Sequence, residues 1–177
     1  MGTLNLGGAT LSASGGNWTD APAGTIIQMA SASSGPARQT ITSATPVVIT
    51  GLSVDFTPRR SNSKILISAF ITSTFPHVSS VSVYQDGTAT ASTSGYTNTN
   101  GANLNVTRYE GEPTTQTAYL SQVPVLITLD AGNTNQRTYD IRANASWGGN
   151  AYTLYINDRG TSDMASFSRM FIYEVAQ

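Results

Sequence analysis

Short runs that alternate apolar and polar residues, separated by clusters of turn-forming residues, make up most of the chain from residue 25 onward. In the segment Lys64–Thr74, every second position is apolar: Ile65, Ile67, Ala69 and Ile71. A period of two is the signature of a β-strand that buries one face. The segment Arg137–Ser146 alternates in the same way and predicts a strand whose other face, with Asp140, Arg142 and Asn144, meets solvent.

The same reasoning predicts further strands along the domain. The predicted strands are Thr25–Ala30, Gln39–Thr42, Val47–Phe56, Lys64–Thr74, Ser80–Gln85, Leu104–Tyr109, Ala118–Leu129, Arg137–Ser146, Tyr152–Asn157 and Ser168–Val175. Between them stand glycines and Asp-Gly, Asn-Gly or Gly-Gly pairs, which form tight turns. No long stretch has the 3.6-residue period of a helix. We therefore expect an all-β domain over residues 25–177, built as an antiparallel β-sandwich or jelly roll.

Residues 1–24 differ from the rest because they are small, polar and rich in glycine. Four apolar residues stand alone in this segment: Leu4, Leu6, Leu11 and Trp18. So few apolar side chains cannot form a core. The segment is therefore predicted to be an extended N-terminal arm, either disordered alone or docked on another protein. Its four apolar residues are the candidate contacts with a partner protein.

The composition of the chain limits the kinds of partner that it is expected to bind. Charged residues make up only 11% of the chain, and the formal net charge is −1. Such a surface exerts no long-range attraction on nucleic acid or on an anionic membrane, so neither is expected as a partner. A polar surface with few charges does suit a protein that is buried in an assembly.

Cysteine is absent, so neither a disulfide nor a thiolate metal site can hold the fold. The N-terminal segment has no basic region followed by a long apolar run, and no stretch reaches transmembrane length. We therefore expect synthesis in a reducing cytoplasm.

Candidate catalytic groups are sparse. The single histidine, His77, lies in a turn sequence, and no nucleophile elbow, phosphate-binding loop or dinucleotide fingerprint occurs. Glu110 and Glu112 fit an exposed turn better than a glycosidase pair. Asp158 and Asp163 have a loose calcium-loop composition but lack the EF-hand spacing. The sequence therefore predicts no enzyme activity, no cofactor and no metal site.

Arg59, Arg60 and Lys64 place three of the nine basic residues of the chain close together. Pro58 ends the preceding strand, and a short polar connection leads into the next strand, so the cluster marks a corner of the sandwich. Basic side chains at such a corner are ordinarily solvated. The alternative is that they contact acidic groups on a neighbouring subunit.

Two aromatic residues are candidates for binding a glycan, because an exposed ring can stack on a sugar. Trp147 lies in the sequence SWGGN at the end of a predicted strand, and Tyr96 lies in a Gly/Ser/Thr/Asn-rich segment over residues 88–102. The alternatives are that Trp147 caps the core and that the segment around Tyr96 is a surface loop without a ligand.

Five segments, in chain order GTIIQM, VVITGLSVDFTPRRSNSKILISAFI, VYQDGTA, YTLYINDRGTSD and FIYEVAQ, carry a resemblance that covers about residues 23–177. They resemble β-rich virion proteins of tailed phages that infect marine and freshwater bacteria. Members of that family are described as tail-fibre, head-fibre or capsid-decoration components, and the family supplies no catalytic residues. Gln85 and Tyr173 stand where arginine and methionine are usual, and neither departure bears on function.

The resemblance implies a virion structural protein on the particle surface, made in the cytoplasm of a bacterial host and trimeric. The first hypothesis is a homotrimeric capsid decoration (cement) protein that bridges major capsid proteins. The alternative is a tail- or head-fibre tip that binds host surface glycans through Tyr96 or Trp147. The chain lacks the coiled-coil or repeat shaft that a fibre normally needs, which favours decoration.

Overall fold

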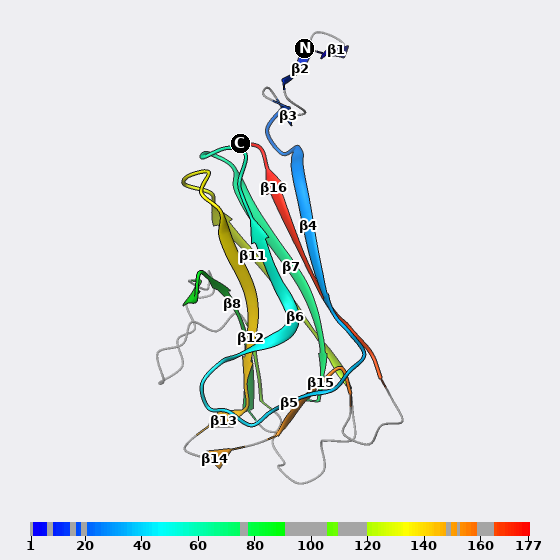
Figure 1. Cartoon of the computed structure of the whole chain (residues 1–177), viewed down its shortest axis with the longest axis vertical. Coiled ribbons are helices and arrows are strands. Elements are labelled where there is room, and N and C mark those ends of the chain that lie inside the picture. Colours follow the sequence, from blue (N-terminus) through cyan, green and yellow to red (C-terminus); the bar gives the residue numbers. More distant parts are fainter. Residues whose placement is uncertain are drawn as a thin grey trace.

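The computed structural model contains only β-strands as regular elements in the part of the chain that it describes (Figure 1). The backbone is described for residues 2–6, 9–14, 17–18, 21–74, 78–90, 106–109, 120–147, 150–151, 153–158 and 165–177, and side chains for 21–74, 80–90, 120–145, 153–158 and 165–177. The strands are β1 (Gly2–Leu6), β2 (Ala9–Ser14), β3 (Asn17–Trp18), β4 (Ile26–Ser34), β5 (Gln39–Ile41), β6 (Val47–Phe56), β7 (Lys64–Ser73), β8 (Val78–Gln85), β9 (Thr88–Ala89), β10 (Val106–Tyr109), β11 (Ser121–Asp130), β12 (Arg137–Asn144), β13 (Ser146–Trp147), β14 (Asn150–Ala151), β15 (Leu154–Ile156) and β16 (Ser168–Val175).

Two antiparallel sheets form the body of the molecule. The first sheet has the order β4-β16-β7-β11, and the second has the order β6-β12-β8-β10. The pairing is nested along the chain, since β4 pairs with β16, β6 with β12, β7 with β11 and β8 with β10. Eight antiparallel strands paired in this way and divided between two sheets form a jelly roll. The predicted all-β antiparallel sandwich is confirmed.

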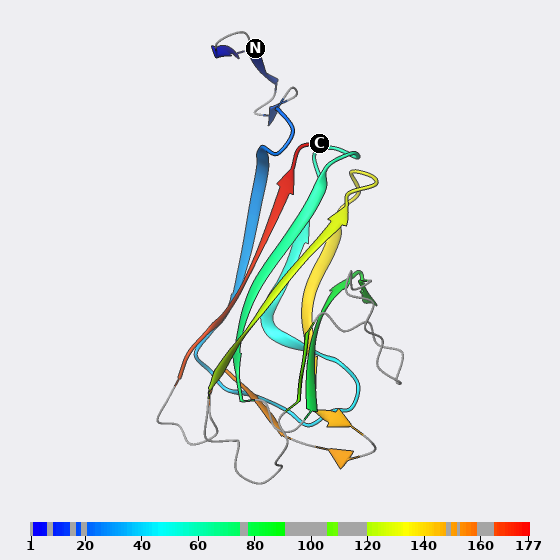
Figure 2. The ribbon, with the colours of Figure 1, turned by 180° about the vertical axis from the view of Figure 1, so that it is seen from behind.

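Shorter strands complete the two sheets. β5 pairs with β15. β15 also pairs with the end of β7, where Ile156 lies opposite Ser73, so β15 lies beside β7 on the side that β16 occupies further along that strand. β9 pairs with β8, and β13 pairs with β14 in a hairpin below the sandwich. Seen from behind, β16, β7 and β11 run side by side along the whole first sheet (Figure 2).

The core lies between the two sheets, where the period-two pattern places it. Inward side chains of β7 and β12 are fully buried, among them Ile65, Ile67, Ile71, Tyr139 and Ile141. The expectation of a solvent-facing side on β12 needs correction, because Asp140 and Asn144 are buried as well. The Asn144 side-chain amide donates to the Ala44 carbonyl oxygen at 3.1 Å, so its burial is satisfied.

At Gly51, the edge strands β4 and β6 approach each other closely. Gly51 has a φ of 85°, and a Cβ atom there would lie 2.8 Å from the carbonyl oxygen of Ser33. Glycine is needed for both reasons. Beside this point the Gln39 side chain donates to the Val48 carbonyl oxygen and accepts from the Thr50 amide, both at 2.8 Å. Gln39 thereby satisfies two backbone groups of β6 where the strand bends.

A buried amide fixes the lower end of the sandwich in Figure 1. Asn157, directly after β15, is fully buried and has a φ of 64°. Its Nδ2 donates to the Ser34 hydroxyl and to the Gly35 carbonyl oxygen, both at 2.8 Å. Its Oδ1 accepts from the Ser168 hydroxyl at 2.7 Å. This side chain therefore links the ends of β4, β15 and β16.

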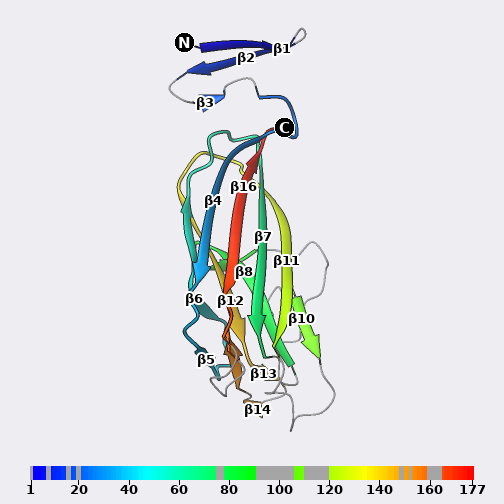
Figure 3. The same cartoon turned by 90° about the vertical axis from the view of Figure 1, so that its right-hand side faces the viewer.

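β1, β2 and β3 form a separate antiparallel sheet beyond the end of the sandwich where the C-terminus lies (Figure 3). The segment that follows this sheet, residues 21–25, is hydrogen-bonded to the end of the sandwich. The Gly24 amide donates to the Ala176 carbonyl oxygen, and the Ala176 amide donates to the Thr25 carbonyl oxygen, both at 2.9 Å. Ala21, Ile27 and Ala176 form a small buried cluster at the same point. The domain boundary at residue 24 stays a prediction.

Candidate interaction surface

A buried carboxylate organises the corner that contains the basic cluster. Glu174 lies on the inward side of β16 and is fully buried. Its Oε1 accepts from the Arg60 amide at 2.9 Å and from the Ser63 hydroxyl at 2.6 Å. Its Oε2 accepts from the Arg59 amide at 2.8 Å and from the Gln28 side-chain amide at 2.6 Å. Donors from four residues therefore satisfy the buried charge and fix the backbone of the corner.

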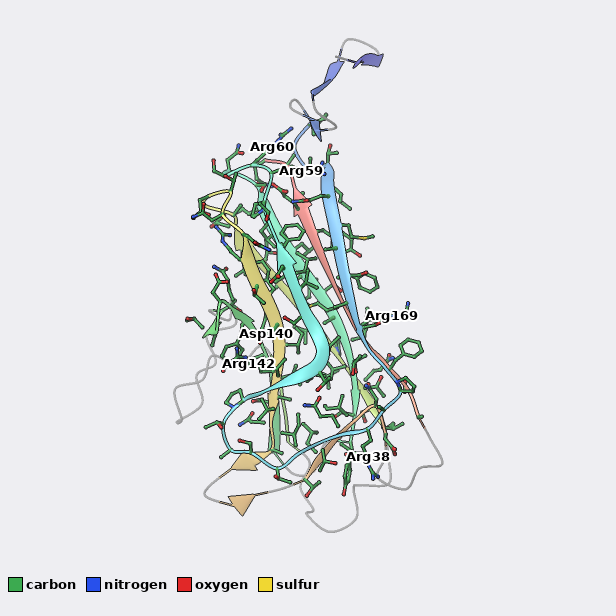
Figure 4. All side chains as sticks on the ribbon, viewed as in Figure 1. Arg38, Arg59, Arg60, Asp140, Arg142 and Arg169 are labelled. Carbon is green, nitrogen blue, oxygen red and sulfur yellow. The ribbon has the colours of Figure 1, made fainter. Side chains whose placement is uncertain are left out.

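The basic side chains of this corner do not converge on one site. Arg59 is exposed, and the Arg60 guanidinium donates to the Ala21 carbonyl oxygen at 3.5 Å. Both lie at the end of the sandwich next to the N-terminal sheet (Figure 4). Lys64 instead forms an ion pair with Asp130 across β7 and β11. The cluster is thus a structural corner, and contact of its side chains with a partner stays a prediction.

The outward side of the first sheet carries apolar side chains on four adjacent strands, and Figure 3 looks onto these strands. The strand registers align the outward positions of β4, β16, β7 and β11 into rows. Three rows cross its middle: Met29, Tyr173, Leu66 and Thr128; Ser31, Phe171, Ser68 and Leu126; Ser33, Arg169, Phe70 and Pro124. A fourth row at the upper end contains Ile26, Val175, Lys64 and Asp130. We call these four rows, with the adjoining Phe167, the outer face.

Large apolar side chains of the outer face are exposed to solvent. Their exposed fractions are 57% for Ile26, 60% for Met29, 45% for Phe70, 68% for Leu126 and 52% for Phe167. Elsewhere in the described side chains, Val47 on β6 is the one large apolar residue with comparable exposure, at 38%. Exposed apolar side chains gathered on one face in this way are typical of protein or membrane contact sites and of ligand-binding grooves.

Aromatic rings on the outer face contact neighbouring side chains. The rings of Phe171 and Tyr173 stack with centroids 6.3 Å apart, and the Arg169 guanidinium lies 4.7 Å from the centroid of Phe167. A shallow hollow of about 280 Å³ is lined by Phe70, Gln122, Phe167 and Arg169. Rings held by such contacts lose little freedom when a partner covers them, so they are suitable anchors.

The second sheet has a different outward side, on which several polar residues of β8 and β12 are buried. Its buried residues include Ser80, Ser82, Asp140 and Asn144. Arg142 donates to Asp140 at 2.6 and 3.1 Å and lies 4.3 Å above the Tyr84 ring. The hydrogen bond that Arg142 donates to Asp140 raises the pKa of Arg142, while burial raises the pKa of Tyr84 against the opposing effect of the Arg142 charge. The guanidinium therefore stays charged and the phenol neutral, as a structural cluster.

The N-terminal sheet brings the four predicted arm residues onto one face. Leu4 lies opposite Leu11, and Trp18 lies opposite Ala13. Residues directly opposite in an antiparallel pair share a face, as do residues two apart in one strand. The register therefore places positions 4, 6, 11 and 18 together on one face of this sheet, an arrangement that the sequence pattern alone did not reveal.

The remaining candidate residues lie mostly in other segments of the chain. Outside the described residues lie Tyr96, His77, Glu110, Glu112 and Asp163. Trp147 belongs to β13, of which the backbone is described. The described residues contain no group of three or more His, Cys, Asp and Glu side chains placed to hold a metal ion. Nor does this part of the chain include a helix with the length and apolar character needed to cross a membrane.

Sequence reasoning missed both Glu174 and the outer face, although each leaves a signal. Glu174 continues the inward alternation of β16, so an acid occupies a core position: Met170, Ile172, Glu174 and Ala176. The outer face shows as apolar residues in the outward register of strands that already have an apolar inward side. Phe70 within SAFI and Phe171 within MFIY are examples.

The chain matches known proteins among solved structures. No protein-family model matches the chain. No curated protein matches it either. Among solved structures, a structure of infectious bursal disease virus, Gx strain, is 12% identical with a TM-score of 0.35, covering 86% of this chain and 39% of that chain. The VP2 subviral particle of infectious bursal disease virus is 12% identical with a TM-score of 0.37, covering 85% and 38%. The chain thus spans less than half the length of these viral proteins, and scores of this size do not indicate a shared function.

Proposed function

We propose that the chain is a virion structural protein, a homotrimeric capsid decoration (cement) protein of a tailed phage. The observation that carries the proposal is the outer face, since rings and aliphatic side chains exposed on a rigid sheet need a protein to cover them. Two further features support it. The jelly roll is an architecture used by viral capsid domains. The five segments quoted above resemble tailed-phage virion proteins.

The work of such a protein is mechanical. It bridges joints between major capsid proteins, and the surface buried at each joint opposes separation under the pressure of packaged DNA. The N-terminal sheet binds the shell through the face that contains Leu4, Leu6, Leu11 and Trp18. Burying one such side chain contributes about 1.5–3 kcal/mol. Three N-terminal sheets on one trimer bind far more tightly than one, because the second and third contacts form at high effective concentration.

The basic corner belongs to the same end of the molecule. Arg59 and Arg60 lie beside the N-terminal sheet, so an acidic surface on the capsid would meet the arm and these cations together (Figure 4). Lys64 contributes less to such a contact, because its ammonium group is already paired with Asp130.

A second candidate function is a tail- or head-fibre tip that binds host surface glycans. One observation favours it: the β13–β14 hairpin with Trp147 lies at the end of the sandwich opposite the N-terminal sheet (Figure 1). A protein held at its N-terminal end would therefore present Trp147 outward. Jelly rolls also occur in lectins.

A binding assay with phage particles tests the proposal. Particles that lack the protein are mixed with the full chain, with residues 21–177, or with a Leu11→Ala/Trp18→Ala variant, and then sedimented. The truncated chain begins at residue 21 because the next residues belong to the body of the molecule. The Gly24 amide and the Thr25 carbonyl oxygen are hydrogen-bonded to the backbone of Ala176. We expect the full chain to sediment with particles, the double variant to bind part-way, and the truncated chain to remain a folded oligomer in the supernatant.

Two results would contradict this proposal. If the truncated chain occupied particles fully, the arm would be dispensable, and Arg59 and Arg60 would be the next residues to change. If the full chain did not bind particles at all, the decoration role would be wrong. Binding to host cells that is lost on changing Trp147 would then favour the fibre tip.

A further inference from the structure

We infer that the outer face is covered by further copies of this chain, so that it forms the subunit interface of the oligomer. This inference rests on the proposed homo-oligomer and adds the surface that joins its subunits. It divides the molecule into a face for self-association and an N-terminal end for the capsid. The size of the face, its charge and the state of the sheet edges support it.

The outer face is large enough for a stable interface. Its four strands contain 9, 10, 10 and 8 residues. With a rise of about 3.3 Å per residue and about 4.8 Å between strands, it measures roughly 30 by 19 Å in plan. This plan area is of the same order as the roughly 800 Å² that each partner contributes to a standard protein interface. A small ligand or a single peptide would leave much of it uncovered.

The charge of the outer face favours a copy of itself over a charged partner. Lys64, Asp130 and Arg169 are the charged residues among its outward positions. Lys64 and Asp130 form an ion pair with each other, and Arg169 lies over the Phe167 ring. The remaining surface is uncharged, so the outer faces of neighbouring subunits can approach a common symmetry axis without repulsion between like charges. A strongly acidic or basic partner would find no complementary field.

The edges of the first sheet are poorly suited to adding another strand. β11 forms one edge, and Pro124 within it has no N–H group to donate. On the other side, β4 is held against β6, where Gly51 approaches the Ser33 backbone and the Gln28 side chain donates to the Thr57 carbonyl oxygen at 2.7 Å. With both edges obstructed, association of subunits through strand addition to this sheet is disfavoured, which favours the exposed face among the described surfaces of the sheet.

Single aspartate substitutions test the inference, with a matched control on the other sheet. Leu126→Asp and Met29→Asp place a charge on each of the two outermost strands of the outer face, β11 and β4, whereas Val47→Asp does the same at an exposed apolar position of β6. Native mass is measured by light scattering over a concentration series, with circular dichroism as a check of folding. Leu126→Asp and Met29→Asp should weaken association at least about 30-fold, as expected where an interface would have to bury an unpaired charge, while Val47→Asp should leave it unchanged.

Peroxide oxidation of Met29 in the unaltered chain gives a second measurement that needs no variant. Met29 is 60% exposed in the single subunit, whereas Met170 is fully buried and serves as an internal control. Met29 should oxidise slowly at concentrations where the oligomer forms and several-fold faster after dilution to the monomer. Met170 should oxidise slowly throughout.

The outcomes separate this inference from the proposed function. If Leu126→Asp and Met29→Asp keep the oligomer intact, or if Met29 oxidises as fast in the oligomer as in the monomer, the face is not the interface. The decoration role would then survive, provided that the protein still binds particles. An unaltered chain that is monomeric in solution, with Met29 protected only on particles, would show that a capsid protein covers the face and would also overturn the inference. A chain that oligomerises through this face but never binds particles would overturn the proposed function alone.

Discussion

Gly51 and Glu174 act on the backbone around them rather than on a ligand. Gly51 lets β6 bend against β4, because both its φ of 85° and the closeness of the Ser33 carbonyl exclude a side chain. Glu174 holds the corner between β6 and β7 by accepting hydrogen bonds from the Arg59 and Arg60 amides. Both residues therefore shape the end and edge of the sandwich that border the outer face.

Gly51→Ala should lower the free energy of unfolding by about 2–4 kcal/mol, since it adds the cost of a left-handed backbone to a steric overlap. Gly132→Ala is the matched control, because Gly132 has a φ of 66° but a Cβ atom there would meet no other atom within 4 Å. Its cost should be limited to about 1–2 kcal/mol. Urea unfolding at constant pH measures both variants. Equal losses for the two would mean that the approach of β4 to β6 is not tight.

Glu174→Gln should destabilise the protein by about 1.5–3 kcal/mol. The new amide group would point a donor at the Arg59 amide or at the Gln28 side chain, where the carboxylate now accepts. Asp130→Asn is the control, because it removes an exposed carboxylate paired with Lys64, and its cost should stay below about 1 kcal/mol. Urea midpoints compare the two. A neutral effect of Glu174→Gln would contradict the assigned role of this carboxylate.

At the scale of elements, the sequence pattern predicted most of the sandwich because inward positions of its strands alternate strictly. The predicted strands Val47–Phe56 and Ser168–Val175 coincide with β6 and β16, and most others differ from the structure by a few residues at their ends. The two-residue strands β3, β9, β13 and β14 were not predicted, since so short a segment shows no period. β4 extends to Ser34, beyond the predicted end at Ala30, because its pairing with β16 continues through small polar residues.

The sequence signals of the outer face and the Glu174 corner could not be assembled into a site without the structure, for a physical reason. Both depend on which strands become neighbours, and the nested pairing joins segments far apart in the chain, such as β4 with β16. Alternation says which residues of one strand share a side, but only the registers bring Met29, Tyr173 and Leu66 into one row. The basic residues of the corner were found, whereas the acid that orders their backbone comes from the last strand.

The end of β15 provides an element-scale prediction, because one side chain there joins three strands. Asn157→Gly keeps the positive φ but removes the hydrogen bonds to Ser34, Gly35 and Ser168. We expect a loss of about 2–4 kcal/mol in the free energy of unfolding, since buried partners are left unsatisfied. Asp86→Gly is the control at an exposed position with a φ of 50°, and the loss of its exposed hydrogen bond should cost about 1 kcal/mol or less. Urea unfolding compares the two variants, and equal losses would mean that the lower end does not depend on Asn157.

At the scale of the whole molecule, different surfaces serve different contacts in the proposed assembly. The outer face joins subunits, the N-terminal sheet and the Arg59–Arg60 corner meet the shell, and the hairpin with Trp147 points away from it. The low charge of the chain agrees with this division, because most of its surface then needs only to pack and to hydrogen-bond. An arrangement of this kind is expected of a protein that stiffens a shell by occupying many equivalent positions.

The amount of this protein in purified virions tests the central claim most directly. Quantitative mass spectrometry of intact particles measures its molar ratio to the major capsid protein. A decoration protein that occupies repeated positions on the shell should be present in copy numbers comparable with that of the major capsid protein. A few copies per particle would instead indicate a fibre tip, and its absence from purified virions would contradict a structural role in the particle.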